Sequence, residues 1–357
     1  MTDMGPMTDM GPMTAAQIRD RVVASLPWRE ATAGGEAVAA ALEVARTAPQ
    51  ALVDRLDGAA RIVVTGAGSS LYIAQVAAFA MRAPADLAAE AQPLSEVLLR
   101  PGAVFAGQAL ADQPVIVVSR SGSTTEALEV IKAARARGQY TLAITCRPDA
   151  PMAASADAVL AVPQGDEQAI VMTRSFVSQV ALLMRLGARL GQGALASDLD
   201  AMPSEWGSLE PWLERAFELA ATNPSRLVVL GGGAAFGLAN EAVLKATETS
   251  QVPASAFHPF EFRHGPISVC EPGMIVVGIL GGEAEADERR VLEESAALGA
   301  TTWALGSDGP GAGLDETARL PLVLHVLQAL ALGIAVRRGL DPDSPRHLGQ
   351  VVVLGGE

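Results

Sequence analysis

The sequence predicts an α/β protein made of two tandem domains, each a doubly wound parallel sheet. Short segments rich in Val and Ile alternate with longer helical patterns, which is the order typical of βαβ units. The strand segments are apolar throughout, as expected for strands that are buried on both faces. The pattern starts again in the second half: VVTGAGSS (63–70) and VVLGGGAAF (228–236) both run from a strand through a glycine turn into a helix. We therefore infer a duplication, with the two halves related by pseudo-two-fold symmetry.

The order of elements follows from these patterns. In the first half we predict strands at 61–65, 114–119, 140–145 and 158–162, and helices at 36–46, 71–82, 124–137 and 174–190. The mixed region 191–223 is expected to be partly helical. In the second half we predict strands at 226–230, 274–280 and 301–305, and helices at 237–251, 285–298 and 320–338. The first domain is accordingly placed at 38–205 and the second at 206–340.

Both ends of the chain look different from the rest. The sequence MTDMGP occurs twice in tandem at the N-terminus, and we expect 1–37 to be an extension that is flexible in part. Regular structure is expected to begin with the helix at 36–46. The last segment, 341–357, opens with too many Pro and Asp residues for regular structure and is interpreted as a tail.

Composition excludes several classes of partner. The formal net charge is −14 and no stretch is rich in Lys or Arg, so nucleic acid and anionic membranes are not expected partners. The most apolar run, 320–336, is interrupted by His325 and Gln328, and no membrane span is predicted. Cys146 and Cys270 lie apart in apolar surroundings, which favours buried thiols in a reduced, cytoplasmic protein. No Cys/His spacing resembles a metal site.

The segment VVSRSGSTTE at 117–126 predicts a phosphate-binding loop. The hydroxyls of Ser119, Ser121, Ser123 and Thr124 follow a buried strand, and Gly122 lets the backbone approach a ligand closely. Ser123 and Glu126 have the spacing of a capping box, so the helix is expected to start there. Its free N–H groups and dipole favour an anion.

A second turn, GAGSS at 66–70, follows the neighbouring strand. Open α/β sheets bind ligands at the carboxyl ends of their strands, so both turns are expected to face one site. No Walker-type loop occurs, and GAGSSL lacks the third glycine of a dinucleotide fingerprint, which disfavours a nucleotide-binding oxidoreductase. The corresponding turn of the second half, 280–283, carries an acid in place of hydroxyls, so we predict one phosphate site per chain.

Three charged residues lie on one stripe of the helix predicted at 237–251. At about 100° per residue, Glu241, Lys245 and Glu248 fall within roughly 60° of each other, with apolar residues on both sides. Partial burial would raise a carboxylate pKa and let it exchange a proton near neutral pH. The alternative is an ordinary surface Glu–Lys pair.

The histidines are few enough to consider singly. His264 lies in a Gly-Pro turn, EFRHGP, and imidazole suits proton transfer at neutral pH. A structural role is the alternative. His258 has weaker context, His325 is expected in the core or an interface, and His347 lies in the tail.

With these motifs in order, the chain resembles the two-domain branch of the sugar isomerase (SIS) family, from about residue 43 to 353. That branch includes the isomerase half of glucosamine-6-phosphate synthase, amino-sugar-6-phosphate deaminases and fructosamine-6-phosphate deglycases. The motifs that carry the resemblance are GAGSS, SRSGSTTE, MTRSF (172–176), NEAVLKATETS (240–250), EFRHGP and DPDSPRHL (341–348). It implies flavodoxin-like domains and a homodimer.

The resemblance also implies roles for individual residues. Glu248 matches the base that moves a proton between C1 and C2, and Glu241 matches another acid lining the site. His264 matches the histidine that opens the sugar ring, which in relatives reaches into the neighbouring subunit's site. The residues implied in phosphate binding are Ser69, Ser70, Ser119, Ser121 and Thr124.

The chain departs from the family pattern in two places. Many relatives carry a lysine in the tail where this chain has Gln350, a possible sugar contact that cannot form an imine. The run MTRSF also differs from the smaller, serine-containing run of relatives with synthase activity. No glutaminase domain is recognised in the chain. The expected function is a phosphosugar isomerase/deaminase that needs no metal or cofactor and acts on an amino-sugar or fructosamine 6-phosphate. A plain aldose–ketose isomerase and a non-catalytic sugar-phosphate sensor stay open.

Overall fold

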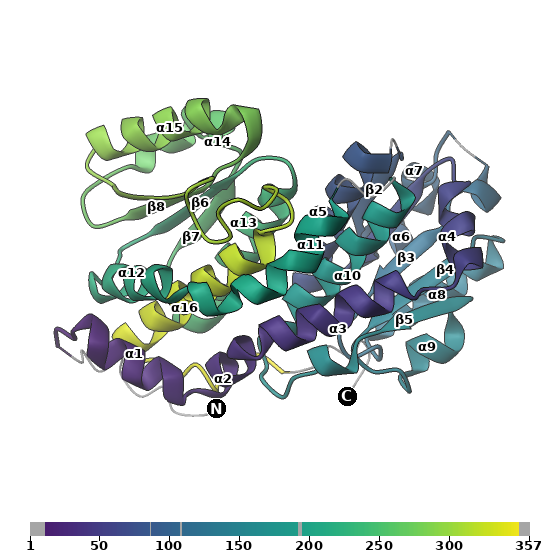
Figure 1. Cartoon of the computed structure of the whole chain (residues 1–357), viewed down its shortest axis with the longest axis horizontal. Helices are drawn as coiled ribbons and strands as arrows, with labels where there is room; N and C mark the ends of the chain where they lie inside the picture. The colour runs from purple at the N-terminus through teal and green to yellow at the C-terminus, as the bar shows by residue number, and fades with distance from the viewer. Residues whose placement is uncertain (1–10, 86, 108, 192–194, 350–357) are drawn as a thin grey trace.

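The computed structural model describes residues 11–85, 87–107, 109–191 and 195–349 and confirms two α/β halves with parallel sheets (Figure 1). The first sheet has the strand order β2-β1-β3-β4-β5, and the second has the order β7-β6-β8-β9. The shared order of the first four strands in each sheet is what a duplication predicts. The strands are β1 (Ile62–Gly66), β2 (Ala89–Pro93), β3 (Val115–Val118), β4 (Thr141–Thr145), β5 (Ala158–Ala161), β6 (Leu227–Gly231), β7 (Ala254–Phe257), β8 (Ile275–Ile279) and β9 (Thr301–Leu305).

Sequence reasoning missed two strands, β2 and β7. Their sequences, AEAQP and ASAF, are short and contain none of the Val and Ile that marked the other strands. Both are edge strands, each paired in parallel with the first strand of its half. An edge strand is buried less completely, so its sequence carries a weaker apolar signal.

Helices cover both faces of each sheet. Alternate side chains of β1 enter different cores: Ile62 and Val64 pack with α5 and α10, whereas Val63 packs with α6 and α8. The helices of the first half are α3 (Gly34–Arg46), α4 (Gln50–Asp57), α5 (Ser69–Ala85), α6 (Leu94–Leu99), α7 (Pro101–Val104), α8 (Thr125–Ala136), α9 (Pro151–Ser155) and α10 (Arg174–Leu190). Those that follow are α11 (Ala196–Ala201), α12 (Glu210–Ala221), α13 (Ala234–Ser250), α14 (Pro259–Arg263), α15 (Glu285–Ala297) and α16 (Leu320–Arg337).

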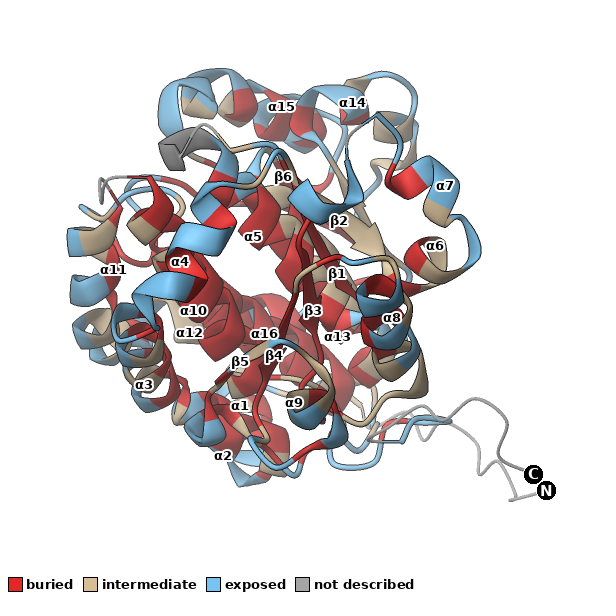
Figure 2. Ribbon diagram, turned by 90° about the vertical axis from the view of Figure 1, so that its right-hand side faces the viewer, coloured by how far each residue is buried: buried red, intermediate tan, exposed pale blue. Residues whose placement is uncertain are grey.

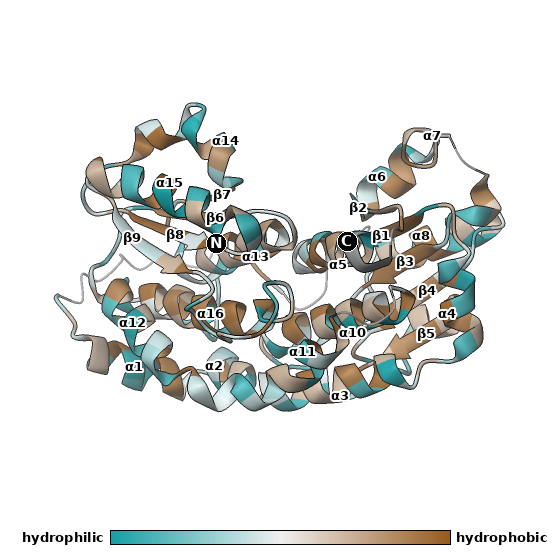
Figure 3. Ribbon diagram, turned by 45° about the horizontal axis from the view of Figure 1, so that its top comes forward, coloured by the Kyte–Doolittle hydropathy of each residue, from teal (hydrophilic) through white to brown (hydrophobic). Residues whose placement is uncertain are grey.

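The inner faces of the two sheets share one continuous core. Val64 of the first sheet and Val229 of the second belong to the same buried cluster, with α5, α10, α13 and α16 between them (Figures 2 and 3). α16 is long and apolar enough to cross a membrane, but 94% of it is buried inside the protein. It is the central core helix, and His325 lies within it, as expected.

The N-terminal segment is more ordered than predicted. Regular structure begins at Ala15, with α1 (Ala15–Ala24) and α2 (Leu26–Thr32), and not with the helix expected at 36–46. Thr14 and Gln17 form a capping box, and Ile18 and Val22, one helical turn apart, are fully buried. The capping box and the apolar spacing could have predicted this helix, but the segment was interpreted together with the adjacent MTDMGP repeat. Most of that repeat lies outside the described residues.

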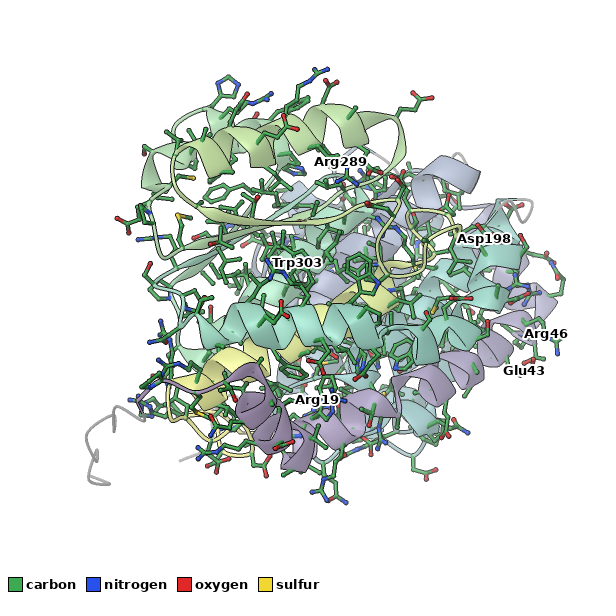
Figure 4. The ribbon with its side chains drawn as sticks, turned by 60° about the vertical axis from the view of Figure 1, so that its left-hand side comes forward. Arg19, Glu43, Arg46, Asp198, Arg289 and Trp303 are labelled. Carbon is green, nitrogen blue, oxygen red and sulfur yellow. The ribbon has the colours of Figure 1, made fainter. Side chains whose placement is uncertain are left out.

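The N-terminal helices lie along both halves of the molecule (Figure 1). Arg19 on α1, labelled in Figure 4, forms ion pairs with two residues of α12: Glu210, at 2.6 Å, and Glu214. Trp28 on α2 packs against Phe217 and stacks on His325, while α3 packs along α10 of the first half. The segment 15–46 therefore braces the second half against the first.

Candidate functional site

The first glycine turn brings two serines to the carboxyl end of β1. A Cβ on Gly66 would lie 2.4 Å from the backbone of Ser70, so only glycine fits this close approach. Gly68 has φ +56°, in the left-handed region. The turn sharply reverses the chain and places Ser69 and Ser70 in the first turn of α5.

The second turn follows β3 and is held by its own hydroxyls. The backbone N–H of Gly122 donates to Ser119 Oγ at 3.2 Å, and the N–H of Ser123 donates to Ser121 Oγ at 3.3 Å. Gly122 has φ +62°, and a Cβ there would lie 2.6 Å from that of Ala150. These contacts fix where Ser119 and Ser121 point.

The helix start differs from the predicted capping box. Thr124 is the N-cap and α8 begins at Thr125, while the hydroxyl of Ser123 is directed to Ser121 Oγ at 3.2 Å. Ser123 cannot cap the helix because it is bound within the loop. Glu126 lies instead on the wall of the pocket that the two turns form.

The two turns meet because β1 and β3 are neighbouring parallel strands. They enclose a pocket of about 220 Å³. All five residues predicted to bind phosphate line it: Ser69, Ser70, Ser119, Ser121 and Thr124. Two other walls come from Lys245 and Glu248 on α13 and from Ile170, Val171 and Met172. One pocket thus joins the predicted phosphate loops with part of the predicted acid/base set.

The charged stripe of α13 forms a buried network, not an exposed ion pair. Lys245 Nζ lies 2.6 Å from Glu248 Oε2 and 3.4 Å from Glu241 Oε1, and only 3% of the Lys245 side chain is exposed. Burial lowers the pKa of Lys245, but the two carboxylates outweigh burial and raise it above its ordinary value. The amine is therefore held as an ammonium.

Glu241 lies behind the pocket wall and joins the two halves. Its Oε1 accepts a hydrogen bond of 3.1 Å from Ser69 Oγ, while Oε2 has no hydrogen-bond partner among the residues that the structure describes. Burial, offset in part by Lys245, raises the pKa of Glu241 to about 8. The predicted tuning of an acid by burial is thus present at Glu241. The hydrogen bond also engages the Ser69 hydroxyl, so Ser69 faces an acid as well as the pocket.

The remaining predicted residues lie elsewhere. His264 is exposed at the end of α14 and does not line the pocket, so a single chain does not bring it together with Glu248. His258 stacks on Phe236 with ring centroids 3.9 Å apart. Gln350 lies outside the described residues. Cys146 is buried and Cys270 only partly so; both are free thiols. No group of potential metal ligands occurs among the residues that the structure describes.

Several residues near the pocket were missed or undervalued. Burial, and to a lesser degree the charges of Glu241 and Glu248, raise the pKa of Tyr72, a residue of α5. Arg120, between Ser119 and Ser121, is 6% exposed and lies 3.8 Å from the fully buried Glu167. An arginine between the serines of the loop could have indicated a buried ion pair. No local sequence pattern indicated that Glu167 would be its partner.

The equivalent place in the second half has different chemistry. A pocket of about 250 Å³ lies at the ends of β6 and β8, where carboxylates of Glu288 and Glu316 approach the turn at Gly281 and Gly282. Burial raises the pKa of both acids. This pocket is thus lined by carboxylates and by Arg319, without the serine hydroxyls of the first half; a single phosphate site per chain stays a prediction.

Comparisons with known proteins agree with this architecture. The chain is 28% identical over 323 residues to a glutamine–fructose-6-phosphate aminotransferase (isomerizing) of Tropheryma whipplei, which covers 82% of this chain and 52% of the relative. The chain spans about half the length of the curated relatives it matches.

Two solved structures show the same fold at low identity. Glucosamine-6-phosphate deaminase of Thermotoga maritima superposes with a TM-score of 0.78 at 24% identity, over 92% of this chain and 100% of that one. Tagatose-6-phosphate ketose/aldose isomerase of Escherichia coli gives 0.76 at 21%, over 93% and 97%. The family model for the SIS domain matches residues 55–189 and 221–312, more than half of the chain. The chain therefore belongs to the sugar isomerase (SIS) family, with two copies of its domain in tandem.

Proposed function

We propose that this chain is a phosphosugar isomerase/deaminase that acts on an amino-sugar 6-phosphate or a fructosamine 6-phosphate. The observation that carries the proposal is the shared pocket: hydroxyls of two phosphate-type turns face an ammonium–carboxylate pair on α13. The first wall suits a phosphate ester, and the second suits a carbon acid whose proton must be moved. The names of the curated relatives and of the similar structures support this class of substrate.

The reaction we propose needs only acid/base groups. After ring opening, Glu248 removes a proton from one of the carbons C1 and C2 and returns it to the other. For an amine-bearing substrate, the nitrogen also loses a proton and the former carbonyl oxygen gains one, so the carbonyl becomes an alcohol and the C–N bond becomes an imine. Water then adds to the imine carbon, and ammonia or an amine leaves with the C–N electron pair and a proton. Lys245 donates a hydrogen bond of 2.6 Å to Glu248 Oε2 and so orients the base at the pocket wall.

We also propose that His264 serves the pocket of a second copy in a homodimer. The motif EFRHGP and the exposed position of His264, away from its own pocket, support this arrangement. Mixing the variants Glu248→Gln and His264→Asn tests it. If subunits exchange, about half of the dimers are mixed and one site in each is intact, so about a quarter of wild-type activity should return. No recovery after proven subunit exchange would rule out a shared site.

Two measurements test the ligand class and the reaction separately: the thermal shift on ligand binding and the release of ammonia. A 2-amino-2-deoxyhexose 6-phosphate should raise the melting temperature, whereas the unphosphorylated sugar should not, and ammonia should be released on incubation. Ser121→Ala with Thr124→Ala should abolish the thermal shift, while Ser197→Ala, an exposed residue away from the pocket, should preserve it. Clean aldose–ketose interconversion without ammonia would identify a plain isomerase. Tight binding with no turnover of any phosphosugar would identify a sensor.

A further inference from the structure

One wall of the candidate pocket is held from outside the SIS domains as the family model delimits them. Residues 170–172, which line the pocket, belong to the irregular segment 166–173 before α10. No ladder of strand or helix hydrogen bonds supports this segment. Its backbone groups need other partners, and charged side chains supply them. Glu167 accepts from the N–H of Thr173, and Arg174 donates to the carbonyl of Asp166. Two further charged side chains hold residues 168–170, which lead into the pocket wall.

The first of these side chains is Glu30 on α2. Its Oε1 accepts a hydrogen bond from the backbone N–H of Gln168, and its Oε2 accepts one from Ala169, both at 2.8 Å. The Glu30 residue is 7% exposed, and Arg174 lies 3.6 Å from its carboxylate. Two short, charge-assisted bonds with a nearby counter-ion form a stiff clamp.

The second side chain is Arg120, in the phosphate loop itself. Its Nη1 donates to the carbonyl of Ala169 at 3.0 Å and to that of Ile170 at 3.4 Å. The segment is thus fixed through its N–H groups by α2 and through its carbonyls by the loop that carries Ser119 and Ser121. The three consecutive residues 168–170 therefore link α2 to that loop.

We propose that Glu30 is a positioning residue for the candidate pocket, so that α2 takes part in phosphosugar binding although it lies outside both SIS domains. Glu30 does not line the pocket; it acts by fixing the wall at 170–172 and, through Ala169, the setting of Arg120. This inference rests on the proposed function for the identity of the ligand. The clamp on the backbone can be tested without that ligand.

The test combines hydrogen exchange with ligand binding. Glu30→Gln turns one acceptor into an NH₂ group that faces a backbone N–H, so one bond is lost. Exchange of the amides at 168 and 169 should accelerate at least about tenfold, since a hydrogen bond to a charged group contributes about 1.5–3 kcal/mol. The dissociation constant for a 2-amino-2-deoxyhexose 6-phosphate should rise by a similar factor. Glu30→Asp, which keeps the charge, should show a smaller effect on both readouts.

The matched control is Arg19→Gln, which removes the ion pairs between α1 and α12 and leaves segment 166–173 untouched. It should change neither readout. Wild-type affinity or unchanged exchange in Glu30→Gln would overturn the proposal, as would an equal loss in Arg19→Gln, because the effect would then come from helix docking in general. Failure of the wild-type protein to bind any phosphosugar would overturn the proposed function instead, and accelerated exchange in Glu30→Gln would still establish the clamp.

Discussion

Glu241 of the second half accepts a hydrogen bond from Ser69 of the first half, 3.1 Å away at the start of α5. The bond ties the phosphate-type turn after β1 to the charged stripe of α13. Because Glu241 is fully buried and beside Lys245, any change of charge on the stripe is felt at the turn. The turn that carries Ser69 and the charged stripe of α13 are therefore electrostatically coupled.

The role of Glu248 is tested by Glu248→Gln. Removing the proposed base while keeping its shape should lower turnover by about 10²–10⁴-fold. Binding of the phosphosugar should survive, since the hydroxyl wall is unchanged. Steady-state kinetics with a parallel binding measurement separates the two effects. Glu218→Gln, on the exposed face of α12, is the control and should match the wild type. Near-full activity of Glu248→Gln would show that another group is the base.

Gly122 should tolerate no side chain. Ala at φ +62° carries a backbone strain of roughly 1–2 kcal/mol, and its Cβ would meet Ala150 at 2.6 Å. Gly138→Ala is the matched control, because it has φ +78° with nothing within 4 Å. We expect both variants to be less stable in urea unfolding, Gly122→Ala more so. Only Gly122→Ala should lose phosphosugar binding. Equal losses of stability and intact binding in both variants would contradict the close packing of the loop.

His325 should make the protein sensitive to mild acid. Burial between aromatic rings lowers the pKa of His325 from 6.5 to about 4. Between these values the unfolded chain takes up a proton and the native protein does not, so stability is full above pH 6.5 and falls as the pH drops towards 4. The loss amounts to about 3 kcal/mol.

Urea unfolding at pH 7 and pH 4.5 measures this effect. His325→Phe keeps an aromatic ring between Trp28 and Trp206 but cannot titrate, so its stability should change less over this range. His347→Asn, at an exposed position with φ +62° that Asn tolerates, should behave like the wild type. A pH dependence in His325→Phe as steep as that of the wild type would assign the effect to other groups.

No sugar should be trapped on Lys245. Its amine is paired with Glu248, lies beside Glu241 and has a raised pKa, and an ammonium has no lone pair with which to attack a carbonyl. Gln350 carries an amide and cannot form an imine either. Borohydride added during turnover should therefore leave the chain unlabelled, as judged by intact-protein mass spectrometry. An adduct on the peptide carrying Lys245 would mean that substrate binding releases the amine and that catalysis is covalent.

Sequence motifs predicted the residues that line the candidate pocket better than the long-range contacts that hold those residues in place. The two turns and the stripe on α13 could be recognised because each is local in sequence: hydroxyls after a strand, or charges at helical spacing. The contact between Ser69 and Glu241 joins residues 172 positions apart, and the bonds from Glu30 to Gln168 and Ala169 span 138 and 139 positions. No local pattern encodes such pairs. The edge strands β2 and β7 were not predicted for a related reason. They are strands because each pairs with a neighbouring strand, and their own composition does not indicate it.

The continuous core between the sheets has a consequence for the origin of the chain. α5 and α13 pack so closely that a Cβ on Gly237 would lie 2.9 Å from the backbone nitrogen of Val76. A single-domain ancestor carrying the same helix would have exposed this face and paired it with that of a second copy. Gene fusion would then have turned a bimolecular encounter into an intramolecular contact, stable at any dilution. Tethering would also let the two halves differ at their turns, as they do here: hydroxyls line the pocket of the first half and carboxylates that of the second.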